Sequence, residues 1–151
     1  MALKPDRVEL LTNVSFFMTA KEFRGGIACV KTSGAGASMD DAGAVVEYAS
    51  AVTGKPVGVL LNDVVDLDLT RQHINWYKDE VQVGGKVTLL RQGEVVTNML
   101  VAGISPAAGD AAYVGVSGLI GTSSASSAAK IGQFLSSKDA DGYAKVSVNI
   151  V

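Results

Sequence analysis

The amino-acid sequence predicts a mainly β fold, a small barrel or sandwich with at most one or two short helices. Short runs rich in valine, leucine and isoleucine recur along the chain, and glycine-bearing turns separate them. The last run alternates strictly, because Ala144, Val146, Val148 and Ile150 are apolar and the residues between them are polar. This period of two is typical of a strand with one buried face. About seven to nine such runs suit a closed or two-layered sheet.

The N-terminal residues predict an arm followed by a first regular element. Met1–Arg7 is polar and contains Pro5, so we expect it to lie outside the core. Val8–Met18 is largely apolar without a clear period, which leaves a strand and a short helix both open. We therefore divide the chain into residues 1–18, the arm and first element, and residues 19–151, a single β-rich domain.

The next segment predicts one strand and one ambiguous element. Gly25–Lys31 is a short apolar run behind a glycine pair, and its Cys29 is the only cysteine, which we expect to be a core residue. Ser33–Ser38 has the small residues of a loop. Asp40–Ala51 could form a helical turn capped by Asp40, or a pair of strands.

The middle of the chain predicts a strand, a polar segment and a hairpin. Lys55–Asp63 is typical of a strand after a turn, and Asp66–Lys78 is polar. Gly84–Asn98 contains two β-rich runs on either side of Gln92 and Gly93, which predicts a hairpin with its turn at that pair.

The C-terminal third predicts short strands joined by tight connections. Ser105–Ala111 is a loop, and Thr122–Ala129 is a serine-rich and alanine-rich tip. Two short strands, Ala112–Val116 and Leu119–Ile120, lie between them. Ile131–Leu135 and the final alternating run lie on either side of Lys138–Gly142, where Gly142 supplies the positive φ of a hairpin turn.

Composition limits the class of partner. The chain has 151 residues, of which 48% are hydrophobic and 19% charged, with a formal net charge of −2. The basic residues are scattered, so the phosphate-neutralising stripe of a nucleic-acid-binding protein is missing. No apolar run approaches the roughly 20 residues of a membrane helix, and no signal peptide is expected. Low charge fits a surface covered by other subunits, although an ordinary surface rich in small residues remains the alternative.

Residues that could carry chemistry do not form a recognisable site. His73 is the only histidine, and a hydrolase would have to combine it with Asp66, Asp68 or Cys29. No nucleophile-elbow motif is present, so we predict no catalytic residue and treat a small hydrolase using His73 as the weakest hypothesis. The acidic residues around Asp66 do not match a calcium loop, and the glycines do not match a phosphate-binding loop. No cofactor or metal is expected.

Two adjacent aromatic residues are candidates for an interface. Trp76 and Tyr77 lie in the polar segment beside Arg71 and His73. On an extended strand one ring would point outward, and an aromatic ring with cationic neighbours has the composition of an interface anchor. The alternative, that both rings pack in the core, is left open.

Three stretches carry a resemblance to a known family: Lys55–His73, Glu80–Gly93 and the segment from Ile131 to Val148. Together they resemble the small decoration, or cement, proteins on the capsids of tailed bacteriophages, cyanophages in particular, whose domains are β-tulip-like. The resemblance covers the chain from Lys55 onward. The segment Gly25–Gly54 is longer than its counterpart in the smaller members, which leaves its role open.

The resemblance implies a function without an active site. A cement protein made in the host cytoplasm would bind the major capsid protein on the outer capsid surface, bridge capsid subunits and form a homotrimer with other copies. Its extended arm would supply contacts, here Leu3, Lys4, Pro5 and Arg7. The same kind of barrel also occurs in tail and baseplate subunits of phage particles, which is the alternative function.

Overall fold

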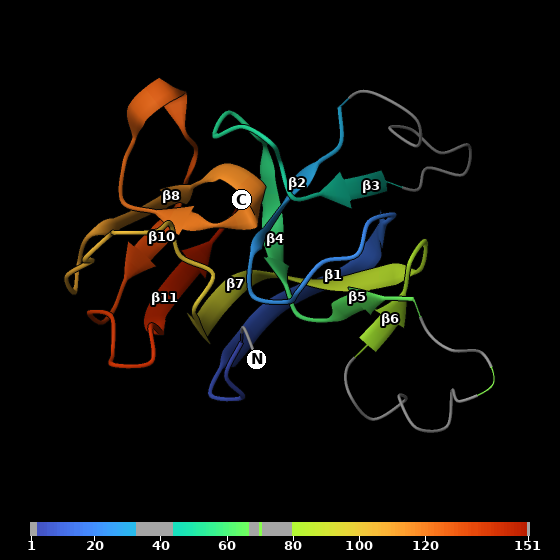
Figure 1. Cartoon of the computed structure of the whole chain (residues 1–151), viewed down its shortest axis with the longest axis horizontal. Helices are drawn as coiled ribbons and strands as arrows, with labels where there is room; N and C mark the ends of the chain where they lie inside the picture. Colours follow the sequence, from blue (N-terminus) through green and yellow to red (C-terminus); the bar gives the residue numbers. More distant parts are fainter. Residues whose placement is uncertain (1–2, 33–43, 67–69, 71–79, 151) are drawn as a thin grey trace.

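The computed structural model describes residues 3–32, 44–66, 70 and 80–150, and these residues confirm a mainly β fold. The strands are β1 (Val8–Met18), β2 (Ile27–Val30), β3 (Ala44–Glu47), β4 (Pro56–Leu60), β5 (Asp63–Val65), β6 (Glu80–Gln82), β7 (Lys86–Thr97), β8 (Ala111–Val114), β9 (Ile120–Gly121), β10 (Lys130–Phe134) and β11 (Ala144–Asn149). The described residues contain only two helical segments, the 3-10 turns η1 (Val116–Gly118) and η2 (Ala125–Ser127). Figure 1 shows the arrangement.

Five of the strands close into a ring. β1 pairs with β3 in parallel, and β3, β2, β4 and β7 then follow as antiparallel neighbours. β7 returns to β1 through antiparallel pairs that run from Val8 opposite Glu94 to Phe17 opposite Lys86. The first run of the sequence, for which strand and helix were both open, is therefore a strand that completes the ring.

The same nine-stranded sheet continues beyond the ring as β11, β10, β8 and β9, which we call the sheet extension (Figure 1). β11 pairs with β7 along six residues, and β10, β8 and β9 follow in order as antiparallel neighbours. The β10–β11 pair confirms the predicted C-terminal hairpin, and Gly142 in its connection has a φ of 86°. The predicted alternation is also confirmed, because Ala144, Val146, Val148 and Ile150 are all buried.

The hairpin predicted at Gln92 and Gly93 is wrong. Lys86–Thr97 is one continuous strand, β7, which pairs with β1 on one edge and with β4 and then β11 on the other. Gly93 is required for a different reason: a Cβ atom there would lie 2.0 Å from the carbonyl oxygen of Val8. A glycine that permits close backbone approach gives the same sequence pattern as a turn glycine.

Two hydrophobic cores share a wall made of β2, β4 and β7. The ring core receives side chains from all five ring strands, with Met18, Ala28, Val46, Leu60 and Leu89 among them. The sheet core lies between the ring and the sheet extension and includes Cys29, Val59, Leu90, Ile131, Phe134 and Val146. Leu89 and Leu90 are successive residues of β7, each 0% exposed, and they face different cores. The wall is therefore buried on both faces at Leu89 and Leu90, and the unbroken apolar runs of β2 and β4 are typical of strands in such a position.

The ambiguous segment Asp40–Ala51 contains a strand at Ala44–Glu47, so the strand alternative applies there. Asp40, the predicted helix cap, lies outside the described residues, as does the predicted loop Ser33–Ser38. Tyr48 follows the strand. Its hydroxyl accepts a hydrogen bond from the Gly26 N–H at 3.1 Å and donates one to the carbonyl oxygen of Phe23. This pair of bonds fixes the entry to β2.

We expect the protein to lose stability above about pH 9. Cys29 is buried, as predicted, and burial raises the pKa of its thiol from the usual 9.0 to about 11. Burial also raises the pKa of the Tyr48 hydroxyl. In the unfolded chain the thiol ionises near pH 9 and the Tyr48 hydroxyl near pH 10, before either group ionises in the folded protein. The stabilisation by the neutral groups is thus complete below about pH 9 and is lost as the pH approaches 11.

Urea denaturation at a series of pH values measures this effect. The urea midpoint should fall between pH 9 and 11, and the fall should be smaller in Cys29→Ala, which has no thiol to ionise. A midpoint that stays constant up to pH 11 in the unaltered protein would contradict the burial of both groups.

Candidate interaction surface

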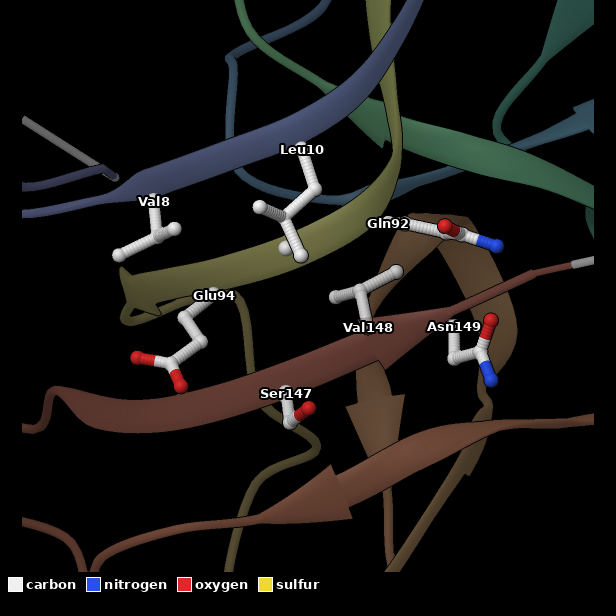
Figure 2. A pocket seen from close by; sticks show the side chains of 8 residues that line it. Val8, Leu10, Gln92, Glu94, Ser147, Val148 and Asn149 are labelled. Carbon is white, nitrogen blue, oxygen red and sulfur yellow. The ribbon is translucent and has the colours of Figure 1, made fainter.

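The outer face of the sheet formed by β1, β7 and β11 is the candidate functional surface. Because side chains alternate along a strand, burial of Val146 and Val148 places Lys145, Ser147 and Asn149 of β11 on the opposite side. β7 adds Gln92 and Glu94 to that side, and β1 adds Val8 and Leu10. Figure 2 shows the side chains of the residues that line a depression across the three strands, namely Val8, Leu10, Gln92, Glu94, Ser147, Val148 and Asn149.

Two open depressions adjoin on this face. The first has a volume of about 330 Å³ and lies over β1, β7 and β11. The second has a volume of about 400 Å³ and is lined by Lys130, Gly132 and Gln133 of β10 together with Ser147 and Asn149, which both depressions share. A broad, shallow surface of this kind is suited to contact with another protein rather than to enclosing a small molecule.

Most charged groups of this face are paired with one another, and Lys130 beside the second depression is a further cation. Lys145 Nζ lies 3.1 Å from Glu94 Oε2, and Arg7 Nε lies 2.5 Å from Glu9 Oε1 at the start of β1. Glutamine, serine and asparagine supply most of the remaining polar atoms. The face is therefore close to neutral.

Apolar side chains along β1 are exposed. Val8 is 45% exposed, Leu10 75%, Leu11 46% and Val14 60%. The register of β1 against β7 shifts three times between Glu9 and Phe16. Such irregularities bend a strand and redirect its side chains. Only the end of β1 contributes to the ring core, through Phe16 and Met18. We call Val8, Leu10, Leu11 and Val14 the β1 stripe.

The predicted arm residues lie against the chain's own body. Leu3 is 1% exposed in the sheet core and forms a bridge with Thr97, and the Lys4 N–H donates to the Val96 carbonyl at 2.9 Å. The expectation that residues 1–7 lie outside the core is therefore wrong at Leu3. β7 extends beyond its pairing with β1, and its end pairs with Leu3 through Thr97. Pro5 is exposed and Arg7 is half-buried.

Lys4 connects the N-terminal segment to the β10–β11 connection. Its Nζ lies 3.3 Å from Asp139 Oδ2 and 4.5 Å from the centre of the Tyr143 ring. The backbone N–H of Tyr143, followed by the Lys4 ammonium, lowers the pKa of the Asp139 carboxyl. The predicted contacts of Leu3, Lys4, Pro5 and Arg7 with a capsid stay a prediction.

The other predicted interface residues, Arg71, His73, Trp76 and Tyr77, lie outside the described residues. Sequence reasoning missed the β1 stripe and the outer residues of β7 and β11. The signal was present in Val8–Met18, where apolar residues follow no period. A strand that does not alternate has no single buried face, which can indicate contacts outside the chain.

Within the described residues, no three histidine, cysteine, aspartate or glutamate side chains lie close enough to share a metal ion. No helix in that part of the chain has the length and apolar character needed to cross a membrane.

Comparison with family models identifies the family of the chain. The model of a family described as "Structural cement protein (E217 gp24/Pam3 gp6)" matches residues 9–149, which is almost the entire chain. No curated protein matches the sequence.

Proposed function

The chain belongs to the family of phage structural cement proteins, and from this premise we propose that it binds the outer surface of the capsid as a homotrimer and bridges neighbouring major capsid protein subunits. Membership makes the chain a structural protein of a phage virion that stabilises the capsid. It also accounts for the β-rich fold and indicates a non-enzymatic role.

The observation that carries the proposal is the family match, which runs from β1 to the last residue of β11. The geometry supports it in two respects. The outer face of β1, β7 and β11 is broad and nearly neutral, and the β1 stripe offers apolar area that another copy can cover in a homotrimer. Many modest contacts of this kind hold a protein firmly on a lattice, because copies on a capsid act multivalently.

Binding to capsids tests the proposal. Purified protein is mixed with expanded capsids that lack it, the particles are sedimented, and their disruption temperature is followed by dye access to the packaged DNA. We expect co-sedimentation and a higher disruption temperature than that of undecorated particles. Bovine serum albumin at equal concentration serves as the control for non-specific capture. A chain that stays in the supernatant would refute the proposed function.

Two further measurements test its finer parts. Light scattering of the purified protein should give three times the 15.5 kDa of one chain. Antibody labelling of intact virions should decorate the capsid from outside. Label confined to the tail would favour a tail or baseplate subunit instead, and a mass of one chain would remove the homotrimer.

A further inference from the structure

We propose that copies of this chain meet one another through the β1 stripe and the adjoining depression over β7 and β11. The inference rests on the proposed function and deepens it, because it assigns self-association to a particular surface and leaves other faces for the capsid subunit.

The exposure of the β1 stripe is the first observation. Seven large hydrophobic side chains in the described part of the chain are exposed, and four of them are Val8, Leu10, Leu11 and Val14. They fall within seven successive residues of one strand, whereas Phe23, Val30 and Val116 are scattered over other segments. Single exposed apolar residues are ordinary, but a contiguous group marks a surface that another molecule covers.

The backbone of β1 offers a second contact. One edge of β1 pairs with β7, and its other edge pairs with β3 only from Phe16 onward. Among the described residues, no strand pairs with the outer edge of β1 between Val8 and Ser15. An exposed, apolar strand edge is a template for pairing with a further strand, and proteins usually protect such edges with charge. This edge carries little charge.

The charge pattern indicates what kind of molecule covers the β1 stripe. Leu10–Met18 contains no charged residue, although 19% of the chain is charged. The two acids near the depression, Glu9 and Glu94, are both paired within the chain, to Arg7 and Lys145. A surface that is neutral as a whole favours a neutral partner, because a charged one would bury its charges unpaired.

A second copy of this chain satisfies that requirement. Its own β1 is the uncharged, apolar strand that the surface is suited to receive, and two identical neutral surfaces meet without like-charge repulsion. Val8 and Leu10 supply both the projecting side chains and one wall of the depression, as Figure 2 shows. Val8 and Leu10 of one copy would therefore pack into the depression of the other. Around a symmetry axis, the same residues from each copy would pack together.

Charge substitution in the β1 stripe tests the inference. Leu10→Glu places a carboxylate at the most exposed position of the stripe, where the fold should tolerate it. Val8→Glu and Val116→Glu form a matched pair, because both valines are 45% exposed but only Val8 lies in β1. Mass is measured by sedimentation equilibrium over a series of concentrations, and circular dichroism confirms that each variant is folded.

We expect the unaltered protein and Val116→Glu to self-associate equally, and Leu10→Glu and Val8→Glu to sediment as single chains. Self-association of Leu10→Glu at the level of the unaltered protein would overturn the inference, and so would an equal loss of self-association in Val116→Glu.

Disulfide cross-linking gives a second measurement if a glutamate variant fails to fold. Oxidised Leu10→Cys should form disulfide-linked dimers, whereas Val116→Cys should not, since Cys29 is buried in both. No linkage through position 10 would count against the contact.

Capsid binding separates this inference from the proposed function. Unaltered protein that binds capsids but sediments as one chain at every concentration would leave the proposed capsid binding standing and would remove both the homotrimer and the β1 contact. Self-association through β1 without capsid binding would leave the β1 contact standing and refute the proposed capsid binding. A Leu10→Glu protein that still self-associates but no longer binds capsids would assign the stripe to the capsid subunit, which would also overturn the inference.

Discussion

Gly93→Ala is expected to lower the free energy of unfolding by about 3–5 kcal/mol, in the range reserved for severe single substitutions. The alanine Cβ would lie 2.0 Å from the carbonyl oxygen of Val8, and Gly93 has a φ of 150°, where side chains are disfavoured. Because β1 pairs with β7 at this point, relief of the clash requires moving one strand away from the other. Chemical denaturation followed by tryptophan fluorescence measures the loss.

Gly103→Ala is the matched control for Gly93→Ala. Gly103 also has a positive φ, 80°, but a Cβ there has no neighbour within 4 Å. Gly103→Ala should lower the free energy of unfolding only by the backbone strain, about 1–2 kcal/mol. Equal losses of unfolding free energy in the two variants would mean that the close approach of β1 to Gly93 adds nothing to the effect of Gly93→Ala.

Phe134→Ala is expected to cost about 3–5 kcal/mol, the usual range for deleting a buried phenylalanine. Phe134 is 0% exposed in the sheet core, and its backbone is held on both sides, by hydrogen bonds to Asp110 and from Gly109. The chain therefore has little freedom to collapse into the cavity that the substitution leaves. The thermal midpoint and the denaturant midpoint should both fall.

Phe23→Ala provides the comparison, since this ring is 72% exposed. The same chemical change at the surface should alter the free energy of unfolding by no more than about 0.5 kcal/mol. If Phe23→Ala were as damaging as Phe134→Ala, the ring would have to be covered in solution by a contact that one chain does not contain.

Local pattern was sufficient to predict some elements from the sequence. β11 could be assigned because the alternation over Ala144–Ile150 shows which side of the strand faces the core. Its pairing with β10 could be predicted because a turn that contains Gly142 connects the two strands. The burial of Cys29 followed in the same way from its apolar neighbours. These features depend on residues that are close together in the chain.

Features that depend on distant partners could not be predicted. Gly93 resembles a turn glycine until the path of Val8, 85 residues earlier in the chain, is known. Leu3 resembles part of a free arm until Thr97 is seen to accept its pairing. The β1 stripe required the strand register, because the sequence shows apolar residues but not which of them remain uncovered. The fold class was thus accessible from the sequence, and the interaction surface was not.

The wall shared by the two cores has a consequence for how the molecule comes apart. β7 contributes Leu89 to the ring core and Leu90 to the sheet core. Unfolding of the strands around either core would therefore remove side chains that the other core needs. Half-melted molecules should therefore be scarce, and the amides of β2, β4 and β7 should exchange with solvent only through complete opening. On a capsid, such a subunit would either unfold completely or keep its shape.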